Sequence, residues 1–145
     1  MRRFRFNLER LLELRSFHER KAELLLAEKA GRCALLDARL KEVALSRSTT
    51  SREMFGPGRG IDDYRASSLY LVRLDAERDR LLEELARAEL EREEARKAYV
   101  AKRREREAID KLKERRQAEY YRLAEREETK ILDDHARRRP VEAQG

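Results

Sequence analysis

The chain has 145 residues and a net charge of +6 at pH 7, and 46% of its residues are charged. An ordinary globular domain has roughly 25% charged residues, and only 5 Gly and 2 Pro are present here to form turns. This composition excludes a compact, sheet-containing enzyme and predicts one coiled-coil domain, residues 1–145, of long helices with a narrow apolar seam. Because the sequence has neither a run of about 18 apolar residues nor a secretory signal, we expect a cytoplasmic location.

The first predicted helix spans about residues 8–53. Between Leu8 and Val43, leucine and other apolar side chains recur at alternating spacings of four and three residues, which is typical of the seam of a coiled coil. Asn7 is expected to cap this helix, because its side-chain oxygen can accept a backbone N–H of the first turn. Serine and threonine at residues 46–51 lower the helix propensity, so we expect the helix to fray there.

A turn is predicted at about residues 54–62, because three of the five glycines and one of the two prolines fall within residues 56–60. The second predicted helix spans about residues 63–138. Asp62 or Asp63 is expected to cap its start, and Pro140 to end it, with a polar tail at residues 139–145.

These elements predict an all-α fold, an elongated antiparallel two-helix coiled-coil hairpin whose second helix is longer than the first. If the helices fold back about the turn, residue i lies opposite roughly residue 116 − i, and about 30 residues of the second helix have no partner. Four apolar side chains lie in this overhang, namely Leu112, Tyr120, Leu123 and Ile131. An exposed helix with an apolar stripe is typical of a surface that binds a partner protein.

The sequence predicts neither catalysis nor a bound metal or cofactor. Its two histidines, His18 and His135, are far apart, Cys33 is the one cysteine, and no His-Glu-x-x-His or Cys-x-x-Cys spacing occurs. Carboxylates on a solvated helix lack the burial that prepares such groups for acid–base chemistry. Acidic residues interrupt the basic run at residues 102–106, so an acidic protein surface is favoured over nucleic acid as its partner.

The opening residues carry the most specific motif. Residues 4–15 read Phe-Arg-Phe-Asn-Leu-Glu-Arg-Leu-Leu-Glu-Leu-Arg, which resembles the Phe-x-Phe-x-Leu-x-x-Leu-Leu-x-Leu-Arg start of the FliJ family of flagellar export proteins. The chain length, the two charged helices, the glycine-bearing turn near residue 58 and the basic C-terminal end are also similar to that family. The resemblance implies an antiparallel coiled coil similar to the gamma stalk of rotary ATPases.

The resemblance also implies two partners. A hexameric export ATPase similar to FliI would hold the chain in its ring, an export gate protein similar to FlhA would receive it, and export chaperones are further candidate partners. The implied ATPase-binding residues are Phe4, Phe6, Leu8, Leu11, Leu12, Arg15, Ile109, Leu112, Tyr120, Leu123 and Ile131. The implied gate-binding residues are Val43, Tyr70 and Leu74. The implied function is that of a non-enzymatic stalk or chaperone-like component of flagellar type III export, held at the inner membrane only through its partners.

Three alternatives stay open at this point. The same physical pattern suits the stalk of an injectisome-type secretion system. It also suits a homodimeric coiled-coil scaffold, in which the overhang pairs with a second copy of the chain. Nucleic-acid binding is the third alternative, and it predicts an affinity that falls steeply with salt concentration.

Overall fold

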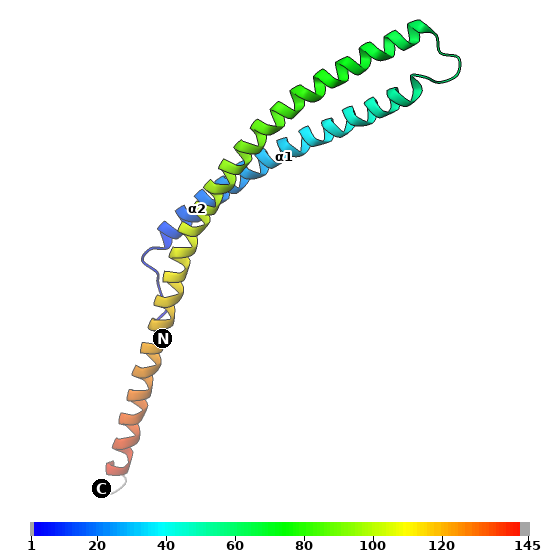
Figure 1. Ribbon diagram of the computed structural model, residues 1–145. Helices are drawn as coiled ribbons and strands as arrows, with labels where there is room; N and C mark the ends of the chain where they lie inside the picture. The colour runs from blue at the N-terminus through cyan, green and yellow to red at the C-terminus, as the bar shows by residue number, and fades with distance from the viewer. Residues whose placement is uncertain (1, 143–145) are drawn as a thin grey trace. The chain divides into compact units, whose positions relative to one another are not determined.

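The computed structural model describes the backbone of residues 2–142 and the side chains of residues 2–139. In this part of the chain, α1 comprises Glu9–Glu53 (45 residues), α2 comprises Ile61–Glu142 (82 residues), and no strand is present (Figure 1). Ion pairs join α1 to α2 in antiparallel order, since Lys29 contacts Glu91 and Arg47 contacts Asp75. The predicted all-α hairpin with a longer second helix is therefore confirmed.

The start of α2 shows how the glycine turn ends. Gly60 precedes the helix, and its backbone N–H donates to Asp63 Oδ2 at 3.1 Å, while the Tyr64 N–H donates to the Gly60 carbonyl. Asp63 therefore caps the helix from its third position, as in one half of a capping box. This places the start at Ile61, earlier than the predicted residue 63.

The other helix ends also differ from the sequence-based expectations. The Asn7 side-chain oxygen accepts a hydrogen bond from Arg116 Nη1 at 2.6 Å, and α1 begins only at Glu9. The hydroxyl-rich residues 46–51 stay helical. Helix α2 continues through Pro140 to Glu142, so the expectation that Pro140 ends the helix is wrong. Residues 143–145 of the predicted tail lie outside the described residues.

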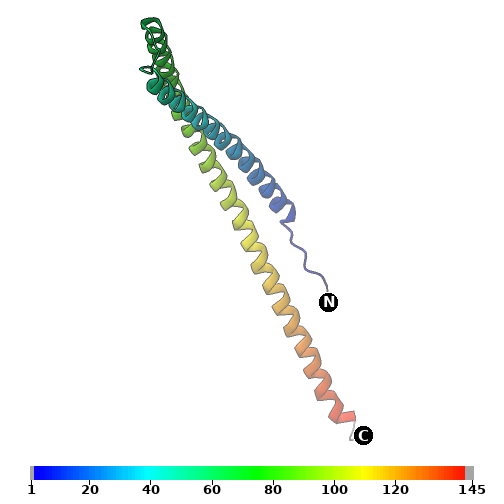
Figure 2. The same cartoon turned by 90° about the vertical axis from the view of Figure 1, so that its right-hand side faces the viewer.

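The chain divides into two compact units, each with a part of both helices. The hairpin unit is Arg20–Val100, which holds the glycine turn. The terminal unit combines residues 2–19 with residues 101–142 of the described chain. In the terminal unit the residues before α1 are not helical, as Figure 2 shows for the segment that follows the N-terminus.

The core of the hairpin unit is one apolar seam between α1 and α2. Its buried members are Cys33, Leu36, Val43, Leu74, Leu81 and Ala88, with Leu40 and Leu85 packed against them. These side chains follow the alternating spacing that predicted a coiled coil, so burial on one face drives this pairing. Small residues at several of these positions keep the seam narrow.

The side-chain pairs are displaced from the predicted register. Glu9 pairs with Lys113, and Arg15 pairs with Glu105, whereas a partner at 116 − i would place each contact several residues earlier on α2. Side chains of a helix lean toward its N-terminus, so on two antiparallel helices they lean in opposite directions. Each side chain therefore meets a partner farther along α2 than the backbone register alone indicates.

Candidate partner-binding surfaces

Ion pairs line the seam of the terminal unit, beside the buried apolar side chains of Phe6 and Leu12. Arg15 Nη1 lies 2.7 Å from Glu105 Oε2, and Lys113 Nζ lies 2.8 Å from Glu9 Oε2. Arg106 contacts both Glu19 and Asp110, and its side chain keeps only 26% of its exposure. Arg15, Glu19, Arg106 and Lys113 occupy heptad seam positions, so this part of the coiled coil mixes charged layers with apolar ones.

Several of these pairs shift the pKa of a member. The hydrogen bond to Glu19 raises the pKa of the Arg106 guanidinium, and the hydrogen bond from Arg103 lowers the pKa of the Glu107 carboxyl. In the hairpin unit, the hydrogen bond from Lys29 lowers the pKa of Glu91 in the same way. The shifted groups are all held in their charged forms at neutral pH.

The residues before α1 pack on α2 through aromatic contacts. Tyr120 donates its hydroxyl proton to the Arg2 carbonyl at 2.7 Å, and its ring centroid lies 5.6 Å from that of Phe4. Phe6 is buried, and the Arg116 guanidinium lies 5.9 Å from the centroid of its ring. The prediction that Tyr120 lacks an intramolecular partner is therefore wrong, because residues 2–8 extend the contact beyond the start of α1.

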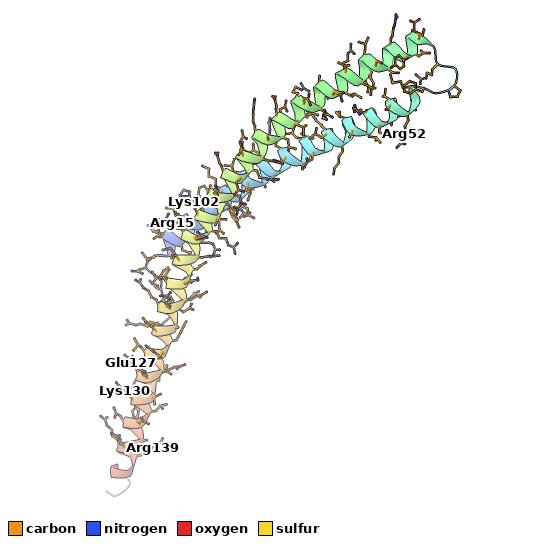
Figure 3. The ribbon with its side chains drawn as sticks, in the orientation of Figure 1. Arg15, Arg52, Lys102, Glu127, Lys130 and Arg139 are labelled. Carbon is orange, nitrogen blue, oxygen red and sulfur yellow. The ribbon has the colours of Figure 1, made fainter. Side chains whose placement is uncertain are left out.

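Beyond Tyr120, α2 carries an apolar stripe that nothing covers within the described chain. Leu123, Ile131 and Leu132 are all more than half exposed. Within the described chain, no hydrogen bond, ion pair or ring contact joins residues 122–139 to another element, and Figure 3 shows Glu127, Lys130 and Arg139 on a helix with no second helix beside it. We call residues 121–139 the α2 extension.

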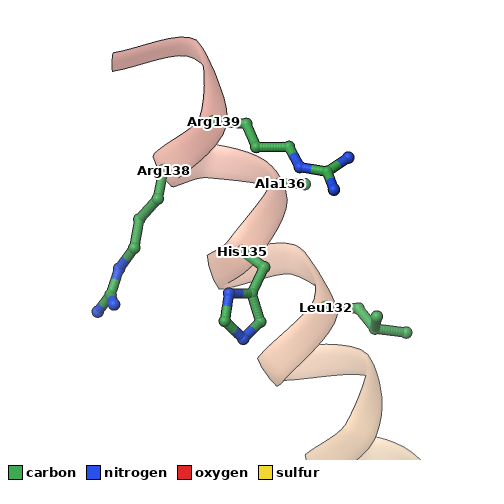
Figure 4. Close-up of a pocket in the computed structure, with 5 residues that line it drawn as sticks. All are labelled: Leu132, His135, Ala136, Arg138 and Arg139. Carbon is green, nitrogen blue, oxygen red and sulfur yellow. The ribbon is translucent and has the colours of Figure 1, made fainter. Parts of the chain in front are cut away.

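The end of the α2 extension combines apolar and basic side chains. Figure 4 shows Leu132, Ala136 and Arg139 on one side of the helix, with Arg138 on the opposite side and His135 between them. Since only one helix of the described chain contributes, these side chains enclose no cavity. They form an open surface that suits a protein partner better than a small molecule.

The implied ATPase-binding residues differ in their exposure. Phe6 and Leu12 are buried, and Leu123 and Ile131 are exposed. The remaining members are half-buried, namely Phe4, Leu8, Leu11, Arg15, Ile109, Leu112 and Tyr120. All of them belong to the terminal unit, in which residues from the start of α1 and from the second half of α2 occur together. Their role in binding an ATPase stays a prediction.

The implied gate-binding residues do not form one surface. Val43 and Leu74 are 7% and 5% exposed and belong to the apolar seam, whereas Tyr70 is exposed. A partner could reach the first two only if the helices separated. Tyr70 is thus the one member of this set that is available on the surface of the closed hairpin.

An aromatic cluster beside the glycine turn was missed by the sequence reasoning. Phe55 is 78% exposed, and its ring centroid lies 5.6 Å from that of Tyr64, while Ile61 between them in sequence is also exposed. The signal was an aromatic residue directly before Gly-Pro-Gly, where the turn prevents burial in the seam. We call Phe55, Ile61 and Tyr64 the turn cluster.

The described residues contain no group of three or more His, Cys, Asp and Glu side chains that could hold a metal ion. Cys33 is a free, buried thiol in the seam. Among the same residues, no helix is both long and apolar enough to cross a membrane.

The described chain is thus a two-helix coiled-coil hairpin with exposed apolar surfaces. Residues 4–145 match the family model described as flagellar FliJ protein. The chain therefore belongs to the FliJ family and is a component of the flagellar export apparatus. Comparison with curated proteins and comparison with solved structures gave no match.

Proposed function

We propose that this chain is the stalk of the flagellar export ATPase, and that the terminal unit docks into a hexameric ring similar to FliI. The observation that carries the proposal is the α2 extension, which exposes Leu123, Ile131 and Leu132 without a partner in the described chain. Leaving such side chains in water forgoes roughly 25 cal/mol for each Å² of apolar area that a partner would bury. A ring that surrounds a single helix can cover several faces of it at once.

The exposed positive charge of the N-terminal segment also supports an ATPase ring as the partner. Arg2, Arg3 and Arg5 are exposed next to the α2 surface that Tyr120 occupies. In an acidic pore these arginines would steer the chain into the ring and would make its association rate sensitive to salt. The stalk itself carries out no reaction; it acts by favouring ring assembly and by coupling hydrolysis to the gate.

The turn cluster supports a second contact, to an export gate protein similar to FlhA. Phe55 and Ile61 are exposed large apolar residues, and Tyr70 lies on the surface of the same hairpin unit. Aromatic residues of this kind often supply the few contacts that dominate a protein interface. Through these two partners the chain would sit at the cytoplasmic side of the inner membrane, at the flagellar base.

The test is capture of the purified export ATPase from the same organism by the immobilised chain. We expect the triple variant Leu123→Ala, Ile131→Ala and Leu132→Ala to lose at least about tenfold in affinity, because three exposed apolar contacts are removed. The matched control is Leu82→Ala with Leu90→Ala, which are exposed leucines of α2 in the hairpin unit. This control should bind as the wild type does.

Circular dichroism would show that each variant keeps its helicity. Equal capture by the wild type and the triple variant would remove the α2 extension from the interface. Capture of nucleic acid in place of the ATPase, with an affinity that falls steeply with salt, would instead support the nucleic-acid alternative.

A further inference from the structure

The outer face of α1 in the hairpin unit, on the side away from α2, exposes three leucines at coiled-coil spacing. Leu24, Leu35 and Leu45 are 66%, 55% and 69% exposed, and no residue of the described chain covers them. Together with Lys21, Glu28, Gly31, Ala38 and Glu42, all exposed, they follow the alternating three- and four-residue spacing of a coiled coil. We call residues 21–45 at these eight positions the outer seam.

We propose that the outer seam pairs with the outer seam of a second copy of this chain, in antiparallel orientation. Its two seams give α1 the pattern of a helix that is contacted from both sides, and α2 fills only one of them. A symmetric dimer needs one self-complementary surface. The order of side chains along the outer seam supplies such a surface.

Charge selects the antiparallel orientation. In a parallel pair, Lys21 would face Lys21 of the second copy and Glu42 would face Glu42, which is repulsive. In the antiparallel pair in which residue i faces residue 59 − i, which superposes residues 21–38 of the two copies, Leu24 faces Leu35 of the second copy, and Lys21 faces Ala38, one helical turn from Glu42 of that copy. Each dimer then contains two Leu24–Leu35 layers and two Lys21–Glu42 ion pairs. Neither Lys21 nor Glu42 forms an ion pair within the described chain.

Gly31 accommodates the remaining charged residue of the seam. In the same antiparallel pair it faces Glu28 of the second copy, and a Cβ atom built at Gly31 would meet nothing within 4 Å. This open space lets the Glu28 carboxylate reach solvent. The two Glu28 side chains lie one layer apart near the centre of the dimer, so their repulsion limits its affinity.

The test is sedimentation equilibrium of the full chain over a concentration series at low salt. We expect the wild type to show a reversible monomer–dimer equilibrium. Lys21→Glu or Glu42→Lys alone should raise the dissociation constant about three- to tenfold, because each breaks two symmetric ion pairs, and the double charge swap should restore it. Glu28→Ala should tighten the dimer.

Leu35→Asp should abolish the dimer, while Leu82→Asp with Leu90→Asp on α2 should leave it unchanged. All these side chains are exposed in the single chain, so the variants keep the hairpin, as circular dichroism would show. A wild type that stays monomeric up to about 0.5 mM, or a double charge swap as weak as the single variants, would overturn the proposal. So would a dimer that depends on Leu123 and Ile131 instead of Leu35. The inference is independent of ATPase binding, so either can fail alone.

Discussion

In both units of the chain α1 packs against α2, but different side chains make the contacts. In the hairpin unit, Leu36, Leu81 and their neighbours form a dry seam whose burial holds α1 to α2. In the terminal unit, seam positions beside the buried Leu12 are charged, and ion pairs join Arg15 to Glu105 and Glu19 to Arg106. Apolar burial contributes roughly 1.5 to 3 kcal/mol per large side chain, whereas a partly exposed ion pair contributes about 1 kcal/mol or less.

Because of this difference, the hairpin unit contributes most of the stability of the fold, and the terminal unit has contacts that can be replaced by a partner. The hairpin unit has the contacts that resist unfolding, whereas the terminal unit has contacts that salt weakens and a partner can replace. Ion pairs also fix which residues of α1 and α2 meet, because each charged side chain reaches its partner at only one alignment of the two helices along their axes. If the terminal unit docks in a ring as proposed, its contacts can rearrange while the apolar seam of the hairpin unit keeps α1 and α2 in register.

The largest effect on the free energy of unfolding should come from creating a cavity in the apolar seam of the hairpin unit. Leu81→Ala removes the most buried leucine, which is 1% exposed, and we expect the free energy of unfolding to fall by about 2 to 4 kcal/mol. Urea unfolding followed by circular dichroism measures this change. Leu90→Ala, at a leucine of the same helix that is 68% exposed, should change it by less than about 0.5 kcal/mol. Similar losses for both would mean that the seam is not the stabilising element.

A smaller effect is expected from the polar seam. Glu19→Ala leaves Arg106 with Asp110 as its strong partner, and we expect a loss of about 1 kcal/mol in the free energy of unfolding. The double variant Glu19→Leu with Arg106→Leu converts the layer to the type found in the hairpin unit, and it should be as stable as the wild type or more stable. If the double variant lost more than the single one, the ion pair would be a net stabiliser of the terminal unit.

The smallest effect is the response to acid. Hydrogen bonds from Arg47 and Lys29 lower the pKa values of Asp75 and Glu91 below their ordinary values near 3.8 and 4.5. A carboxylate with a lowered pKa stabilises the fold above that ordinary value, and the stabilisation is lost as pH falls through the lowered pKa. The melting temperature should therefore be flat above about pH 5 and fall below about pH 4.

Asp75→Asn tests the contribution of one of these pairs. This variant should show a lower plateau and a shallower fall in melting temperature over the same pH range, because the side chain no longer titrates. Ser68→Ala, at a position of α2 without a charge, is the control and should follow the wild-type curve. An Asp75→Asn curve that also matches the wild type would show that this exposed pair adds nothing measurable.

The fold was predictable because its information is local and periodic. Alternating spacings over 30 residues identify each helix, and Gly56-Pro57-Gly58 cannot continue one. The details at the helix ends were not predictable in this way. Asn7 has a residue type suited to capping, yet its side chain contacts Arg116, which is far away in the sequence.

The candidate surfaces were predictable only in part. Leu123 and Ile131 were expected to be exposed and are. Tyr120 was expected to be exposed with them, but residues before α1 reach back to it. The seam positions Val43 and Leu74 were assigned to a partner although the pairing of α1 with α2 buries them, and the outer seam was not noticed because a heptad pattern does not say which of two faces is covered.

The sequence by itself determined the secondary structure, the turn, the antiparallel pairing and the family, because each depends on residue type and short-range spacing. Only the tertiary structure decided which side chains remain exposed, since exposure depends on what the other helix and the N-terminal segment cover. The two faces of α1 in the hairpin unit thus become different surfaces: the face toward α2 forms the core, and the leucines of the outer seam stay exposed.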